Sequence, residues 1–112
     1  MTEKKIPKDV QEKIAELQLL QQRLNLFANQ KQVFQIQQIE IENALKEIKG
    51  AKAPVYKLVG EILIEKAPDE LKKELEEKKS DAEIRIKSLE KQEEKTKEKA
   101  LELQKEVTKN LE

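Results

Sequence analysis

Apolar residues recur at steps of three and four along two long stretches of the chain, one on each side of its midpoint. In the first stretch this spacing is typical of a helix that packs along a partner helix in a coiled coil. We predict this helix over residues 8–49, because Gly50 suits the left-handed position after a helix and Pro54 disfavours continuation. The predicted seam consists of Leu17, Leu20, Leu24, Phe27, Lys31, Phe34, Gln38, Ile41, Leu45 and Ile48.

The second stretch has the same spacing and a similar length. It opens with Pro68, Asp69 and Glu70, which suit a first helical turn because proline fits there and acidic side chains offset the helix dipole. We predict a helix over residues 68–110 that pairs antiparallel with the first, so that positions whose numbers sum to about 119 face each other. Its seam consists of Leu71, Leu75, Ala82, Ile86, Leu89, Glu93, Thr96, Ala100, Leu103 and Val107.

Polar side chains interrupt this otherwise apolar seam at Lys31, Gln38 and Glu93. Two interpretations of Lys31 and Gln38 remain open. In the first interpretation, these residues fix the register of the helix pair at some cost in stability. Alternatively, their long stems only cover the edge of the seam while their polar ends reach water.

A second set of apolar residues lies outside the seam of the first helix. If Leu17 takes heptad position a, three of these residues fall at position c, which a two-helix pair leaves exposed. We expect this surface either to pack in a larger assembly or to meet a ligand. The alternative is that the seam assignment is shifted and this set belongs inside it. The residues are Leu19, Leu26 and Val33, followed by Ile36 and Ile39.

Residues 55–66, "VYKLVGEILIEK", differ from both flanks because they are rich in β-branched residues and contain a glycine. They predict a β-hairpin with a two-residue Gly60-Glu61 turn of type II′, which pairs Val59 with Ile62. Apolar residues fall on both faces, and an isolated two-stranded hairpin is marginal in water. We therefore predict that other chains complete this sheet; the alternative is a hairpin folded back on its own helices. The assembly residues are Val55, Tyr56, Leu58, Val59, Gly60, Ile62, Leu63 and Ile64.

Composition narrows the possible functions. The chain has 112 residues, 41% of them charged and 3% aromatic, which suits a narrow seam and one modest domain over residues 1–112. Lys plus Arg equals Asp plus Glu at 23 each, so no overall charge favours nucleic acid or an anionic membrane. The chain has no Cys and no His, and only Gly50 and Gly60 are available for a phosphate loop. We expect a cytoplasmic protein that is not an enzyme and has no cofactor, metal site, nucleic-acid partner or membrane partner.

Three segments resemble the β-type subunit of the prefoldin family. "VYKLVG" followed by "IL" is similar to that family's central hairpin and is the most specific part. "AEIRIKSLEKQE", with Arg85, Leu89, Gln92 and Glu93, is similar to its second helix. The first helix resembles its opening helix at Pro7, Val10, Gln11, Leu17, Gln21, Gln22, Leu24, Gln30 and Lys31.

The resemblance implies a chaperone subunit in a hexamer of two α-type and four β-type subunits. It implies that the hairpins join into a β-barrel platform, from which the coiled coils project. It further implies that the coiled-coil tips hold unfolded proteins without ATP and deliver them to a group II chaperonin. At this chain's tip the expected client-binding residues are Ile6, Val10, Ile14, Leu17, Leu103, Val107 and Leu111. A structural or tethering coiled-coil protein is the alternative, and it accounts for the seam but not for the hairpin.

Overall fold

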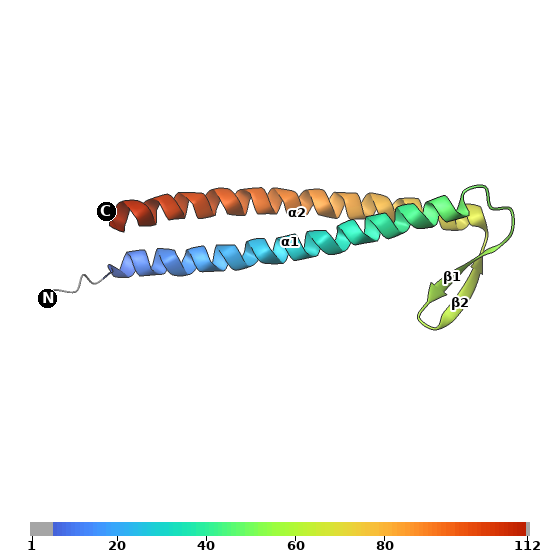
Figure 1. The fold of residues 1–112 in the computed structure, drawn as a ribbon, viewed down its shortest axis with the longest axis horizontal. Coiled ribbons are helices and arrows are strands. Elements are labelled where there is room, and N and C mark those ends of the chain that lie inside the picture. The colour runs from blue at the N-terminus through green and yellow to red at the C-terminus, as the bar shows by residue number, and fades with distance from the viewer. Residues whose placement is uncertain (1–5, 112) are drawn as a thin grey trace. The chain divides into compact units, whose positions relative to one another are not determined.

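The computed structural model describes residues 6–111, with only the backbone of Leu111, and contains two long helices and one β-hairpin (Figure 1). Helix α1 spans Lys8–Ile48 and helix α2 spans Pro68–Leu111. Strands β1 (Val55–Val59) and β2 (Ile62–Lys66) lie between them in the chain. The predicted fold class of two long helices with a central antiparallel hairpin is confirmed. Helix α1 ends one residue earlier than predicted and α2 one residue later.

Local chemistry accounts for where the helices begin and end. The backbone N–H of Gln11 donates to the carbonyl oxygen of Pro7 at 3.0 Å, and that of Leu71 donates to Ala67 at 3.1 Å. Pro7 therefore stands just before α1, whereas Pro68 is the first residue of α2. Gly50 has φ 76°, a left-handed conformation that costs a glycine little. The N–H of Ala51 then donates to the carbonyl of Ile48 at 3.1 Å and closes the end of α1.

The contacts of the chain group into two compact units, which are described separately. The first unit joins the part of the chain up to Lys31 with the part from Ser88 onward. Within it Val10, Leu20 and Val107 are buried, and Lys13 forms an ion pair with Glu106 at 3.4 Å. This pair fits the predicted register, so the helix segments of this unit run antiparallel with the predicted seam inside.

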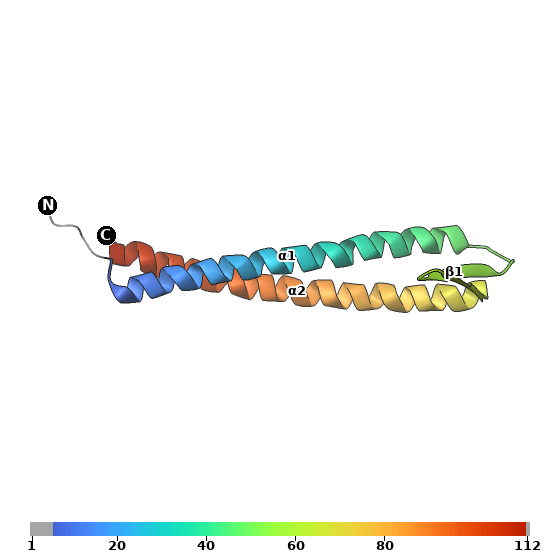
Figure 2. The same ribbon diagram turned by 90° about the horizontal axis from the view of Figure 1, so that it is seen from below.

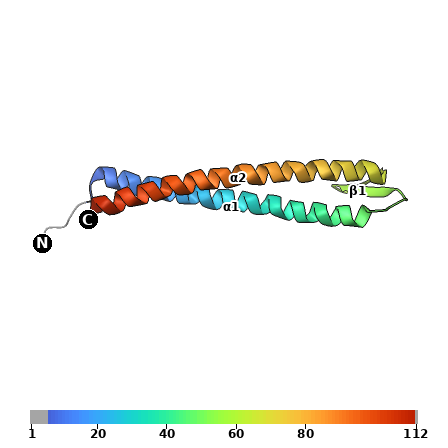
Figure 3. The same cartoon turned by 90° about the horizontal axis from the view of Figure 1, so that it is seen from above.

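The second unit comprises Gln32–Lys87 and includes the hairpin. The Arg85 guanidinium lies over the Phe34 ring, 5.4 Å from its centroid, and Lys79 pairs with Glu42 at 3.6 Å. Both pairs fit the predicted register, and the views from below and above (Figures 2 and 3) show the end of α1 and the start of α2 running antiparallel here. The buried side chains of this unit are Leu71, Ala82 and Ile86. The single-domain organisation over residues 1–112 stays a prediction.

Candidate functional site

The hairpin has the predicted register and turn. Val59 pairs with Ile62, and Leu58 pairs with Leu63. Gly60 has φ 63°, and no residue other than glycine has a positive φ in the described part of the chain. A positive φ at the first central residue alone is the pattern of a type II′ turn. The sheet has two strands, so each strand leaves one edge unpaired.

Large apolar side chains of the hairpin are exposed to solvent, as expected for a sheet that other chains complete. Tyr56, Leu58 and Leu63 are each more than 60% exposed, and Ile62 is 67% exposed. A lone hairpin with this surface would bury little apolar area of its own. Val55 is half-buried, whereas the remaining members of the predicted set, Val59, Gly60 and Ile64, are exposed.

The two faces of the hairpin differ in what they meet. The strand register places Lys57 and Lys66 on the same face, and both contact Glu74 in the second turn of α2. The Nζ of Lys66 lies 2.6 Å from Oε2 of Glu74, while Lys57 donates to Oε1. These charged contacts join the hairpin to the start of α2, although most of its apolar side chains stay exposed.

Glu74 is electrostatically perturbed by this arrangement. The hydrogen bonds from Lys57 and Lys66 lower the pKa of its carboxyl group from 4.5 to about 2. Lys78 lies 3.5 Å from Oε1 of the same carboxylate, one helical turn further along α2. In return, the hydrogen bond to Glu74 raises the pKa of Lys57. Glu74 is not among the residues that the sequence predicts, because no periodic signal relates a helix residue to two strands.

The predicted client-binding residues lie in the first unit and differ in exposure. Ile6 is 43% exposed, whereas Val10 is 1% exposed and Val107 is 9% exposed. Ile14, Leu17 and Leu103 are half-buried, and the side chain of Leu111 lies outside the described residues. The buried members close the helix pair in this arrangement. They meet another molecule only if this end of the helix pair opens.

The apolar set outside the seam is exposed. In the first unit Leu19 and Leu26 are 56% and 52% exposed. In the second unit Val33, Ile36 and Ile39 are also about half exposed. Each of the predicted seam residues of α1 is buried or half-buried, so the alternative of a shifted seam is excluded.

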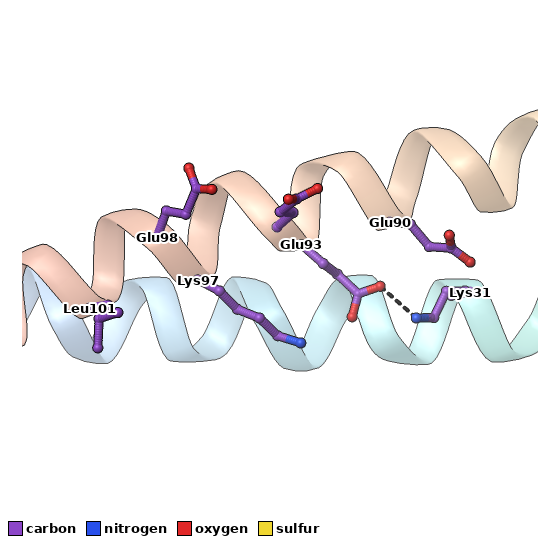
Figure 4. Close-up of a pocket in the computed structure, with 7 residues that line it drawn as sticks. Lys31, Glu90, Glu93, Lys97, Glu98 and Leu101 are labelled. Carbon is purple, nitrogen blue, oxygen red and sulfur yellow. Dashed lines mark ion pairs between the residues drawn. The ribbon is translucent and has the colours of Figure 1, made fainter.

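The polar interruptions Lys31 and Glu93 meet each other inside the first unit. Figure 4 shows the Lys31 ammonium facing Glu93 beside a shallow groove whose other side chains are mostly charged. Their Nζ and Oε1 atoms are 2.7 Å apart, and Glu93 is only 9% exposed. The hydrogen bond to Glu93 raises the pKa of Lys31. The interpretation that Lys31 only covers the seam edge is therefore wrong, because its charged end is paired across the seam.

Among residues 6–111, no group of three or more Asp or Glu side chains is placed to hold a metal ion. Neither helix of the described part has the length and apolar character that a membrane crossing requires.

A model of the prefoldin subunit family matches residues 11–112, and therefore most of the chain. The chain belongs to the prefoldin family. It is 42% identical over 92 residues to prefoldin subunit beta of Archaeoglobus fulgidus. The matched region covers 80% of this chain and 79% of the relative. The corresponding protein of Thermococcus kodakarensis is 39% identical with the same coverage.

A solved structure agrees with these matches. The crystal structure of the prefoldin beta subunit from Thermococcus strain KS-1 superposes with a TM-score of 0.84 and 37% sequence identity, and the match covers 96% of each chain. The resemblance to the β-type subunit that the sequence indicated is confirmed. This chain is thus a subunit of the prefoldin chaperone family.

Proposed function

We propose that this chain assembles through its hairpin with an α-type prefoldin subunit and with further copies of itself. The proposed complex holds two α-type and four β-type subunits, and their strands close a β-barrel platform. The observation that carries the proposal is the exposure of Tyr56, Leu58, Ile62 and Leu63 on a sheet with two open edges. Closing such a sheet with strands of other subunits buries the apolar side chains and satisfies the unpaired backbone groups.

We further propose that the assembled complex holds unfolded proteins in the cytoplasm and passes them to a group II chaperonin without using ATP. Unfolded chains expose scattered apolar groups, so an apolar surface can bind them without reading a sequence. Ile6 is open to such contacts, and the buried pair Val10 and Val107 joins it when the helix ends separate. Several weak sites on one complex act together through their high effective concentration.

Two measurements on the full chain test these proposals. The mass of the chain, alone and with an α-type subunit, reports assembly; we expect a hexamer in the mixture. A light-scattering assay with a chemically denatured client reports holding; we expect the mixture to keep the client dispersed in the absence of nucleotide. A mixture that stays as separate subunits would contradict the assembly proposal. A hexamer that leaves the client to aggregate would contradict the holding proposal.

A structural or tethering coiled coil is the alternative function. It accounts for the buried seam, yet it gives no reason for the exposed apolar hairpin. The same scattering assay separates the two functions, because a tether leaves a denatured client to aggregate. Dependence of holding on ATP hydrolysis by the complex would contradict the passive mechanism.

A further inference from the structure

One carboxylate bonds to both strands of the hairpin. Lys57 belongs to β1 and Lys66 to β2, and the register pairs Lys57 with Ile64 and Lys66 with Val55. Alternate residues of a strand point to opposite faces, so this pairing places both lysines on one face. Glu74 receives Lys57 at Oε1 and Lys66 at Oε2. A single side chain of α2 therefore bridges the whole width of the sheet.

The face that meets Glu74 is the better covered of the two. It includes the half-buried Val55, and its lysines keep less than a third of their side-chain surface exposed. The apolar residues of the same face that lie closer to the turn, Val59, Ile62 and Ile64, remain exposed. The opposite face carries Tyr56, Leu58 and Leu63, whose exposed fractions are 62%, 66% and 66%. Glu74 thus contacts the covered part of the hairpin, whereas the opposite face is exposed at each of these three positions.

The chain connections alone do not fix this orientation. Only Ala67 separates β2 from α2, and Pro68 after it narrows the backbone torsions of Ala67 to the extended region without fixing them. On the other side, residues 49–54 separate α1 from β1 and allow wider movement. An additional contact is needed to keep one face outward, and two charge-assisted hydrogen bonds to one carboxylate supply it.

We propose that Glu74 is the positioning residue of the hairpin: it holds both strands toward α2 so that the Tyr56, Leu58 and Leu63 face is presented to the strands of a neighbouring subunit. This inference rests on the proposed assembly function and adds to it a residue outside the sheet. An orientation set before association lowers the ordering cost of binding. Glu74 therefore promotes assembly through its contacts with the two strand lysines of its own chain.

Charge variants of the full chain, mixed with an α-type subunit, test this proposal. Glu74→Gln keeps the size of the side chain and removes its charge; Glu77→Gln, at an exposed site on the same helix, is the matched control. We expect Glu74→Gln to assemble only at about tenfold higher subunit concentration. A tenfold change corresponds to the loss of one modest contact that orders the hairpin before binding. Helix content, followed by circular dichroism, should stay at the wild-type level, and the control should assemble as wild type.

A charge reversal separates positioning from general stability. Glu74→Lys repels both lysines and should assemble more weakly than Glu74→Gln. Adding Lys57→Glu and Lys66→Glu to that variant restores attraction with reversed signs and should recover assembly. The proposal is overturned if Glu74→Gln and Glu74→Lys both assemble as wild type. It is also overturned if Glu74→Lys loses assembly and the triple variant does not recover it.

The Leu58→Asp variant distinguishes this proposal from the one on which it rests. If Leu58→Asp abolishes assembly while the Glu74 variants assemble normally, only the positioning role is overturned. If Leu58→Asp also assembles normally, the hairpin is not the assembly element and both proposals fall.

Discussion

The ammonium of Lys31 lies 2.7 Å from Oε1 of Glu93, so two polar interruptions of an apolar seam pair with each other across it. The side chain of Lys31 is 25% exposed and that of Glu93 is 11% exposed, so this is the least exposed ion pair between described residues. A partly buried pair of this kind adds little net stability over apolar residues, but it penalises arrangements that separate its members. We infer that the pair selects the register of the helices in this unit.

Removing one member of this pair should destabilise the helices more than removing both. Lys31→Met leaves the Glu93 carboxylate in the seam without its cation and should lower the melting temperature measured by circular dichroism. The double variant Lys31→Leu with Glu93→Leu should melt at or above the wild-type temperature. Lys95→Met, at an exposed position of α2, is the control and should change little. A Lys31→Met variant that melts with the wild type would show that the pair has no such role.

Glu74 should determine how the contact between the hairpin and α2 weakens in acid, because Lys57, Lys66 and Lys78 all face its carboxylate. Its pKa falls from 4.5 to about 2 on folding, so its stabilising contribution is fully present above about pH 4.5. The contribution is lost as the pH falls through about 2. Carbon-detected NMR of the Glu74 carboxyl should show this low midpoint, and the variant Lys57→Met with Lys66→Met should move it back toward 4.5. An unchanged midpoint in that variant would contradict the assigned cause.

Leu58 should control assembly without controlling the helices. It is 66% exposed in the chain alone, and the proposed barrel would bury it. Leu58→Asp would then place an unpaired charge in the barrel at a cost of roughly 3 kcal/mol or more, which weakens association on the order of 100-fold. Ile84→Asp changes a similarly exposed residue of α2, 63% exposed, and should leave the oligomer intact. Size-exclusion chromatography with light scattering measures both, and equal behaviour of the two variants would contradict a specific role of the hairpin.

The sequence predicts most of the fold because its signals are periodic and local. Leu20, Ile86 and the other seam residues follow from steps of three and four, and the turn at Gly60 follows from glycine's tolerance of a positive φ. The contact between Glu74 and the two strand lysines could not be predicted in this way. It depends on how the hairpin rotates relative to α2, and no repeat in the sequence encodes that rotation. The pairing of Lys31 with Glu93 also escaped prediction, because the reach of a long side chain shifts a partner by about one helical turn.

The predicted client-binding residues show a different limit of sequence reasoning. Periodicity identifies Val10 and Val107 as apolar positions at the ends of the helices, and the same periodicity places them inside the seam. Whether a seam residue serves packing or client binding depends on how often the helix ends separate. That separation is an equilibrium property of the terminal turns, which have few neighbours to hold them together.

Removing the helix ends should abolish client holding while leaving assembly intact. Deleting residues 1–15 and 103–112 together removes Ile6, Val10 and Val107 but keeps the hairpin and the central seam, so the complex with an α-type subunit should still form. Loss of the apolar ends should let a denatured client aggregate, because the remaining tip offers less apolar surface to it. The matched comparison is the full-length variant Leu19→Ser with Leu26→Ser, which alters exposed apolar residues outside the seam and should hold the client as wild type does. Light scattering of the client and the mass of the complex are measured on the same samples. If the trimmed complex still suppresses aggregation while the Leu19 and Leu26 variant does not, clients bind along the exposed side of α1 and not at the helix ends.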